Sequence, residues 1–255
     1  MPDKLYASQV AAITGAGQGI GFEIARQLAL QGASVLLNDV DGKQAQRAAS
    51  QIRSEGGICL PIQGDVADPS FLQEMVEEAV RQFGKLTIAI ANAGITLFGD
   101  FFEYTKEALE RVTSVNLGGS FFLAQAAARQ MRKQGTAGRI LFMSSVTGHQ
   151  AHQYLAAYGM TKAALEMLAK SLVIELSPYK ITVNAIAPGA TLTQRTVEED
   201  TQYAEVWSKI TPMGKPATPA DIAHAALFLV SPLSDHITGQ SLIVDGGWSS
   251  ISPQP

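Results

Sequence analysis

Two side chains that could exchange a proton with a bound molecule, Tyr158 and Lys162, stand four residues apart in the sequence. On a helix this spacing puts both on one face, one turn apart. An ammonium about 5 Å from a phenol, at an effective dielectric of about 20, favours the phenolate by roughly 3 kcal/mol. Such a pair suits general acid–base chemistry, and Ser145 could donate a hydrogen bond to the same reacting oxygen. The pair alone also fits a lysine stem packed on an aromatic ring.

The first strand and helix expected along the chain surround a glycine-rich loop. The apolar run Val10–Ile13 leads into the sequence TGAGQGIG (14–21), which a helical pattern follows as far as Gly32. Glycines let the backbone approach an anion, and the start of a helix supplies N–H groups and a positive dipole. This order predicts a dinucleotide phosphate site. A tight strand-to-helix turn without a ligand is the alternative.

Asp39 stands at the end of the second predicted strand, Ser34–Asn38. A carboxylate there can accept hydrogen bonds from both hydroxyls of an adenosine ribose and would repel a 2′-phosphate. No Arg or Lys occurs at Gln18, or after Asp39 before Lys43. The sequence therefore predicts NAD in preference to NADP.

Polar or small residues also follow the next two predicted strands, Ile58–Gln63 and Thr87–Ala91. Asp65, after the first, either meets the adenine amino group or caps a loop. After the second, the segment 92–94 (Asn-Ala-Gly) would pass close under a flat ring, and Asn92 would tie neighbouring strands together through its side chain.

The second half of the chain continues the alternation. A helix expected over 105–134 contains Asn116, which is either a satisfied core amide or part of a proton relay, because buried polar groups need partners. Predicted strands at 139–143, 181–186 and 241–244 follow. The irregular segment 190–217, with Tyr203 and Trp207, is either a substrate lid or a solvated helix packed by two aromatic rings.

Strands that alternate with helices predict a doubly wound parallel α/β sheet of about seven strands, with helices on both faces. No linker or repeat divides the chain, so we expect one dinucleotide-binding domain over 1–255 with a lid around 190–217. Ligands of such sheets gather at the carboxyl ends of the strands, where the polar residues above fall.

Composition limits the class of protein. Of 255 residues, 46% are hydrophobic and 16% charged, with a net charge of −4, which indicates a compact globular protein without a basic face for nucleic acid. Polar residues interrupt the longest uncharged stretches, and the N-terminus lacks a signal-like apolar run, so we expect a cytoplasmic protein without membrane spans. Cys59 is expected in the core. The four histidines lack ligand spacing, so no metal site is predicted.

Together these residues resemble the short-chain dehydrogenase/reductase family over nearly the whole chain. The resemblance is carried by Thr14-Gly15-x-x-x-Gly19-x-Gly21, Asn92-Ala93-Gly94, Tyr158-x-x-x-Lys162, Pro188-Gly189 with Thr193, and Val244-Asp245-Gly246-Gly247. It implies that Tyr158 exchanges the substrate proton, that Ser145 holds the substrate oxygen, and that Lys162 supports the tyrosine and binds the nicotinamide ribose. It also implies that Asn116 places a water linking Lys162 to solvent, and that the protein is a homotetramer joined through long helices.

The resemblance also implies which residues bind the ligands. Ser145, His152 and Tyr158 are expected to bind substrate. The residues expected to bind the cofactor are Gly15, Gln18, Gly19, Ile20, Gly21, Asp39, Asp65, Val66, Asn92, Ala93, Gly94, Tyr158, Lys162, Pro188, Gly189, Thr191 and Thr193.

The sequence thus predicts an NAD(H)-dependent oxidoreductase that interconverts a secondary alcohol and a ketone, a small-molecule substrate, with Tyr158 as general acid/base. Alternatives within this class are a sugar 1-dehydrogenase and a 3-oxoacyl-[acyl-carrier-protein] reductase. The latter usually needs NADPH and a basic docking surface, and Asp39 and the acidic net charge count against it. A non-catalytic cofactor-binding protein is a remote alternative.

Overall fold

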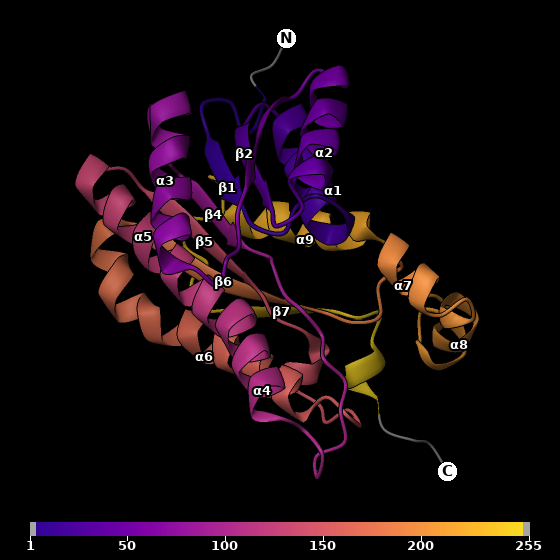
Figure 1. Ribbon diagram of the computed structural model, residues 1–255. Coiled ribbons are helices and arrows are strands. Elements are labelled where there is room, and N and C mark those ends of the chain that lie inside the picture. The colour runs from indigo at the N-terminus through magenta and orange to yellow at the C-terminus, as the bar shows by residue number, and fades with distance from the viewer. Residues whose placement is uncertain (1–3, 252–255) are drawn as a thin grey trace.

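Parallel strands form the central sheet, and helices cover both of its faces (Figure 1). The computed structural model describes residues 4–251. The strands pair in the order β3-β2-β1-β4-β5-β6-β7, all in parallel, which confirms the predicted doubly wound sheet of seven strands. They are β1 (Val10–Ile13), β2 (Ser34–Asp39), β3 (Ile58–Gln63), β4 (Ile88–Ala91), β5 (Gly138–Met143), β6 (Ile181–Pro188) and β7 (Ser241–Val244).

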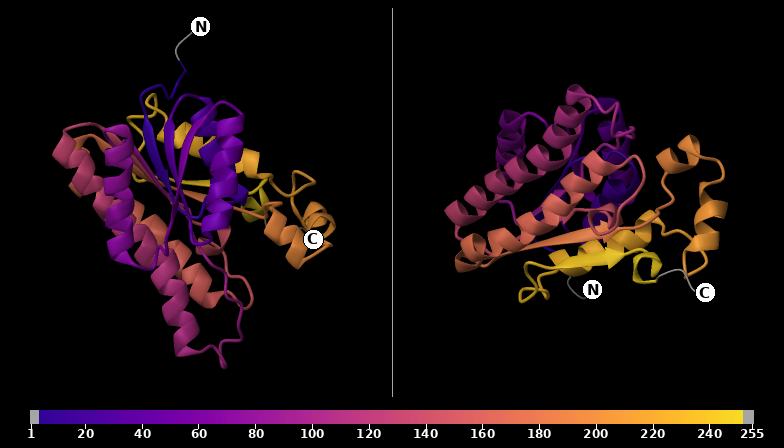
Figure 2. Two further views of the ribbon diagram at one scale, coloured as in Figure 1. Left: turned by 45° about the horizontal axis from the view of Figure 1, so that its top comes forward. Right: turned by 90° about the horizontal axis from the view of Figure 1, so that it is seen from below.

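The helices divide between the two faces of the sheet, and each face has its own hydrophobic cluster. Ala11 and Ile13 of β1 pack with α1, α2 and α9, whereas Val10 and Ala12 pack with α3, α5 and α6, as the alternation of side chains along a strand requires. Figure 2 shows the two layers from other sides. The helices are α1 (Gly19–Leu30), α2 (Gly42–Ser54), α3 (Pro69–Phe83), α4 (Lys106–Thr113), α5 (Gly119–Gln134), α6 (Ala156–Leu176), α7 (Gln194–Glu199), α8 (Tyr203–Ile210) and α9 (Pro219–Val230).

The strand order reverses between β1 and β4, and Asn92 bonds the chain across this point. Its Nδ2 donates to the carbonyl oxygens of Thr14 (3.0 Å) and Gly15 (2.8 Å). In return, the hydroxyl oxygen of Thr14 accepts from the backbone N–H groups of Asn92 and Ala93. The predicted role of Asn92 in tying neighbouring strands together is confirmed. A crevice for ligands opens at such a reversal.

The helical region expected over 105–134 changes its hydrogen-bond pattern at one point. Between α4 and α5 the chain makes a π-helical turn, Ser114–Gly118, which has Asn116 at its centre. A π-turn holds an extra residue, and such turns occur mostly at functional sites. Hydrophobic periodicity alone could not show it, because the apolar face continues through the turn. The expected helical region itself is confirmed, since α4, the π-helical turn and α5 follow one another without a gap.

Helix ends follow the capping residues in the sequence. Asp68 caps α3 by accepting from the N–H of Ser70 at 2.8 Å, Pro69 is the first helical residue, and Gly84 ends the helix in a left-handed conformation. Thr218 and Asp221 form a reciprocal capping box at the start of α9. Local sequence thus sets where these two helices begin and where α3 ends.

The segment 190–217 is more regular than expected, because it contains α7 and α8. A capping box of Thr193 and Thr196 starts α7. At its base the segment is closed on itself, since Leu192 N donates to Ala217 O and Ala217 N donates to Ala190 O, both at 2.8 Å. The two helices extend beyond the carboxyl edge of the sheet (Figures 1 and 2). Movement of this segment as a lid stays a prediction.

Two further observations bear on the sequence-based expectations. Cys59 is 1% exposed within the core, as expected. Across residues 4–251, no helix is both long and apolar enough to span a bilayer. The ends of the predicted domain, residues 1–3 and 252–255, lie outside the part of the chain that the structure describes.

Candidate active site

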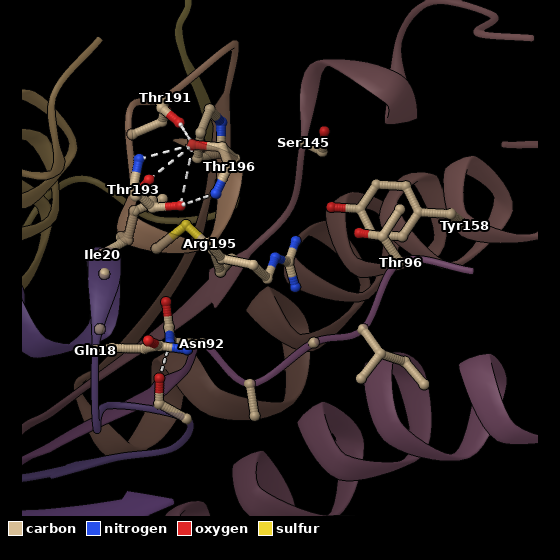
Figure 3. Close-up of a pocket in the computed structure, with 18 of the residues that line it drawn as sticks. Gln18, Ile20, Asn92, Thr96, Ser145, Tyr158, Thr191, Thr193, Arg195 and Thr196 are labelled. Atoms are coloured by element: carbon tan, nitrogen blue, oxygen red, sulfur yellow. Dashed lines mark hydrogen bonds between the residues drawn. The ribbon is translucent and has the colours of Figure 1, made fainter. Parts of the chain in front are cut away.

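A cavity of about 930 Å³ opens at the carboxyl ends of the strands, between the sheet and the segment 190–217. Figure 3 shows part of its lining. Of the predicted site residues, only Asn116 is absent from the lining that the structure describes. The lining includes Gly15, Gln18, Gly19, Ile20, Gly21, Asp39, Asp65, Val66, Asn92, Ala93, Gly94, Ser145, His152, Tyr158, Lys162, Pro188, Gly189, Thr191 and Thr193.

Tyr158 and Lys162 lie on successive turns at the start of α6. The Lys162 ammonium is 5.4 Å from the centre of the Tyr158 ring, is 3% exposed, and donates to the carbonyl of Met143 at 2.7 Å. A lysine that merely packed on the ring would carry its charge out to solvent. Here the charge is held inside the protein, and the end of β5 fixes its position.

Ser145 follows β5, and its hydroxyl oxygen accepts from the N–H of Thr147 at 3.3 Å, at the start of a short 3₁₀ turn (Val146–Gly148). Ser145 and Tyr158 both line the cavity, and in Figure 3 the Tyr158 hydroxyl points into it. The neighbouring Ser144 differs, because its hydroxyl is engaged with Glu166 (2.7 Å) and with the carbonyl of Lys162 (2.9 Å). A substrate oxygen could therefore be held by Ser145 and Tyr158 together.

Asn116 is fully buried behind the cavity wall. Its amide accepts from Ile95 N at 2.8 Å and donates to Ile95 O at 3.0 Å and to Thr161 Oγ1 at 3.2 Å. It is thus a satisfied core amide. A β-carbon added at Gly94 would lie 3.3 Å from Lys162 Nζ and 3.4 Å from Asn116 Oδ1, so the three residues meet at one place. The relay role of Asn116 stays a prediction.

The glycine-rich loop has the shape and the free donors that a diphosphate needs. Gly15 has a φ of +58°, and a β-carbon there would lie 2.7 Å from Ala93 Cα, so no other residue allows this close approach. Helix α1 begins just beyond this loop. The side chain of Gln18 makes no capping bond to the helix, and the first turn of α1 (19–22) contains no acidic residue. Its backbone N–H groups and positive dipole remain available to an anion. The loop therefore fits a dinucleotide.

Asp39 ends β2 and lies at the other end of the cavity. Its carboxylate, 9% exposed as a residue, accepts from Gly17 N at 3.0 Å and from Asp41 N at 3.1 Å. Each oxygen has one backbone partner and retains capacity for a second donor. The carboxylate is thus fixed in orientation and can still accept bonds from a diol.

Asp65 caps a loop, which is one of the two roles that the sequence allowed. Its carboxylate accepts from Ala67 N at 2.9 Å and forms an ion pair of 3.1 Å with Arg111 of α4. The pair crosses the cavity wall between the end of β3 and α4. A contact of Asp65 with adenine stays a prediction.

Three aromatic side chains line the outer part of the cavity. The Trp207 ring lies 5.9 Å from that of Tyr203, tilted by 44°, and 5.4 Å from that of Trp248, at 74°. Burial raises the pKa of the Tyr203 phenol, against the opposing effects of a hydrogen bond to the backbone of Thr191 and the charge of Arg195. The phenol therefore stays a neutral donor at physiological pH.

Comparison with known proteins agrees with this geometry. A family model described as enoyl-(acyl carrier protein) reductase matches residues 15–249. The chain is 37% identical to an L-rhamnose 1-dehydrogenase (NAD(P)(+)) of Sphingomonas sp. (strain SKA58), over 96% of this chain and 97% of that protein. It is 36% identical to versicolorin reductase stcU of Emericella nidulans, over 94% and 95%. A short-chain type dehydrogenase/reductase from Mycobacterium marinum superposes with a TM-score of 0.91 at 34% identity, covering 96% of this chain and 98% of that one. The chain belongs to the short-chain dehydrogenase/reductase family.

Sequence reasoning missed several residues of this dehydrogenase/reductase site. Trp248 follows the predicted Val244–Gly247 motif, where N–H groups of Gly247 and Ser249 bond the carboxylate of Asp245 and turn the chain back to the cavity. The motif could have indicated that the residue after it, Trp248, lies near the cavity. Arg195 points into the cavity in Figure 3, half exposed and 3.5 Å from Glu199. Its position in an irregular sequence segment gave no such signal.

The histidines of this oxidoreductase take different positions. His152 lines the cavity, and its contact with a substrate stays a prediction. His149 instead pairs with Glu166, with 2.9 Å between Nε2 and Oε1. Among residues 4–251, no three His, Cys, Asp or Glu side chains are grouped closely enough to hold a metal ion.

Proposed function

We propose that the protein is a nicotinamide-dependent dehydrogenase that oxidises a CH–OH group of a small polyhydroxylated substrate, with the C1 hydroxyl of an aldose as the first candidate. The observation that carries the proposal is that Ser145 and Tyr158 line the same cavity, with the ammonium of Lys162 buried beside the phenol ring. A proton acceptor and a hydrogen-bond donor then converge on one substrate oxygen.

Each of these residues has a distinct role in the proposed reaction. Tyr158 as phenolate takes the proton of the substrate hydroxyl, while Ser145 donates a hydrogen bond to the same oxygen. Lys162 places its ammonium beside the phenol ring and, since one of its N–H groups is held by Met143 O, directs the others toward the cavity. A bound nicotinamide would supply the hydride acceptor. In the reverse direction Tyr158 returns the proton to a carbonyl oxygen.

NAD is the cofactor that Asp39 favours. A 2′-phosphate near its carboxylate would be repelled, whereas a ribose diol would donate to the free capacity of both oxygens. The L-rhamnose 1-dehydrogenase of Sphingomonas is named with NAD(P)(+), so both cofactors must be measured. Gln18, Gly19, Ile20 and Gly21 would hold the diphosphate, and Thr191 and Thr193 would face the nicotinamide end.

A sugar substrate is supported by the mixture of groups in the outer cavity. Donors and acceptors such as Thr96, His152 and Gln194 line it together with the aromatic rings. Sugars offer hydroxyls to the first kind of group and C–H faces to the second. The rings are tilted at 44° and 74° to one another, so they form a corner and provide no parallel slot that would sandwich a flat ring.

Reduction of an aromatic ketone is the second candidate. The same three rings, Tyr203, Trp207 and Trp248, favour it through edge contacts with a polycyclic substrate. One of the relatives is named a versicolorin reductase. An acyl chain tethered to a carrier protein is less favoured, because the net charge of −4 does not suit docking of an acidic partner.

Initial rates decide between these candidates. The purified protein is assayed with NAD⁺ and NADP⁺ against aldoses, polyols and hydroxy esters, and with the reduced cofactors against aromatic and aliphatic ketones. We expect NAD⁺-dependent oxidation of one or more 6-deoxy or hexose sugars. Turnover confined to aromatic ketones selects the second candidate. Tight cofactor binding without turnover on any substrate would indicate a non-catalytic binding protein and contradict the proposal.

A further inference from the structure

A buried carboxylate lies behind the candidate active site, outside the cavity lining that the structure describes. Glu166, on α6, is 8% exposed, and its Oε1 accepts from the hydroxyl of Ser144 at 2.7 Å. The same oxygen lies 2.9 Å from Nε2 of His149, which reaches the surface. A carboxylate withdrawn from water is costly unless it is bonded or paired. Both contacts offset the cost of burying this side chain.

Glu166 and its two partners, Ser144 and His149, belong to three different parts of the site. Ser144 directly follows β5 and precedes Ser145, which caps the start of the 3₁₀ turn. His149 caps the end of that turn, and Glu166 is one helical turn beyond Lys162. The hydroxyl of Ser144 also lies 2.9 Å from the carbonyl of Lys162. The group thus joins the chain on both sides of Ser145 to the helix that carries Tyr158.

The turn that carries Ser145 packs on α6 without intervening side chains. A β-carbon at Gly148 would lie 3.0 Å from both Ala163 N and Glu166 Oε1, and one at Gly159 would lie 2.8 Å from Thr147 O. Such close backbone packing fixes the distance between the turn and the helix. It does not stop the turn from sliding along the helix, so specific hydrogen bonds are needed for that. The bonds of Glu166 to Ser144 and His149 provide such a restraint at the turn. They add to the bonds of Lys162 with Met143 and Ser144, which lie at the end of β5.

We propose that Glu166 is a positioning residue, which holds the Ser145 turn in register with Tyr158 through Ser144 and His149. The proposal rests on the reaction assigned above to Ser145 and Tyr158. Because productive geometry must be held within a fraction of an ångström, loss of the Glu166 bonds lowers the rate of the chemical step. It leaves the binding of cofactor, which depends on other loops, nearly unchanged.

The test compares Glu166→Ala, which removes both bonds, with Glu166→Gln, which keeps an acceptor oxygen for Ser144. Glu175→Ala is the matched control, since Glu175 is an exposed glutamate on the same helix. We expect kcat to fall about tenfold or more in Glu166→Ala and to recover substantially in Glu166→Gln. KM changes less than kcat, and the cofactor Kd stays within about twofold. Glu175→Ala matches the wild type in all three.

Ser144→Ala keeps the test decisive if Glu166→Ala does not fold. It removes the bond from the other side, and kcat falls in the same way. If both variants fold, the double variant loses little more than the more damaging single variant, because the two residues act as one unit. A kcat within twofold of wild type in a folded Glu166→Ala or Ser144→Ala variant overturns the proposal, as does an equal loss of kcat, cofactor affinity and melting temperature.

Amide hydrogen exchange separates this inference from the proposed reaction. If the wild-type protein turns over no substrate, the proposed function fails, yet the restraint can still be measured. Exchange in 146–155 should be at least several-fold faster in Glu166→Ala than in Glu175→Ala, with exchange in 19–30 unchanged. Equal exchange in 146–155 contradicts the restraint itself.

Discussion

Gly17 donates its backbone N–H to the carboxylate of Asp39 at 3.0 Å, so the glycine-rich loop itself orients the group proposed to select the cofactor. In Asp39→Ala, we expect the affinity for NADH to fall about tenfold, equivalent to roughly 1.4 kcal/mol, because the ribose loses its acceptor. NADPH should lose less, or gain, since a repulsive charge is removed. Fluorescence titration of both cofactors at one ionic strength measures this.

Asp41→Asn is the control for that experiment, because Asp41 is a nearby carboxylate that caps α2 through Lys43 N and Gln44 N. It should lower the melting temperature slightly and leave the ratio of the two affinities unchanged. Equal weakening of NADH and NADPH in Asp39→Ala would contradict the assigned role of Asp39.

Tyr158→Phe should abolish turnover, with a loss of at least about a hundredfold in kcat, because the proton has no other acceptor placed beside Ser145. The cofactor Kd should change little, since the ring and its contact with Lys162 remain. Tyr154→Phe provides the control, as this nearby tyrosine is 49% exposed. Activity that survives in Tyr158→Phe would show that another group moves the proton.

The thiol of Cys59 should be unreactive until the protein unfolds. Burial raises its pKa from 9.0 to about 12, and the charge of Arg53 offsets this only in part. The folded state therefore excludes the thiolate that reacts with disulfide reagents. At pH 8 we expect labelling at the rate of unfolding. Rapid labelling of the native protein would place the thiol at the surface.

The same shift predicts a loss of stability at high pH. A raised folded-state pKa contributes stability that is present below the unfolded value, near 9, and is lost as pH rises toward 12. Tyr6, whose pKa burial raises to about 12, acts in the same direction from about 10 upward. Chemical unfolding between pH 8 and 11 should show the decline, and Cys59→Ala should flatten its early part. An unchanged slope in that variant would assign the decline to other groups.

Trp207→Ala should raise KM for the substrate several-fold and leave the cofactor Kd unchanged, because the ring lines the outer cavity between Tyr203 and Trp248. Trp207→Phe retains an aromatic face and should restore part of the affinity. The ratio of KM values for a sugar and an aromatic ketone in each variant then reports which substrate uses the ring. A KM unaffected by either change would place the substrate elsewhere.

An apolar surface on α5 and α6 should mediate assembly. Phe121, Phe122, Met167 and Ile174 are between 39% and 84% exposed, and exposed apolar groups of this size mark protein interfaces. We expect a tetramer by light scattering and its dissociation in Ile174→Glu. Ile58→Glu, at an exposed apolar residue of β3, is the control. A monomeric wild-type protein would contradict the expectation.

The sheet and most of the site could be predicted because their signals are local. An apolar run followed by glycines or by a polar residue indicates a strand and also shows where that strand ends. Asp39 and Asn92 are such polar residues, each at the carboxyl end of a strand. Parallel topology then brings these edges together. The Tyr158–Lys162 spacing was informative for the same reason, since four residues on a helix define one face.

Features that depend on packing between distant segments could not be predicted. The pairing of Asp65 with Arg111 joins residues 46 positions apart, and the partners of Glu166 come from a turn and a strand end that only the folded chain brings together. Trp248 reaches the cavity because the chain turns back at Asp245. Burial opposes ionisation of that carboxyl, but hydrogen bonds from Ser249 and Gly247 outweigh it and hold its pKa below the usual value.

The π-helical turn at Ser114–Gly118 means that the number of residues between α4 and α5 must be kept for the site to form. A deletion of one residue would allow α4 and α5 to join as a regular helix, but every residue on one side would then rotate by about 100° relative to the other. The side chain at position 116 would then no longer reach the backbone of Ile95, even if it were still an asparagine. A single insertion or deletion within α4 or α5 should therefore disturb the surroundings of Asn116 more than a substitution on the exposed face of either helix.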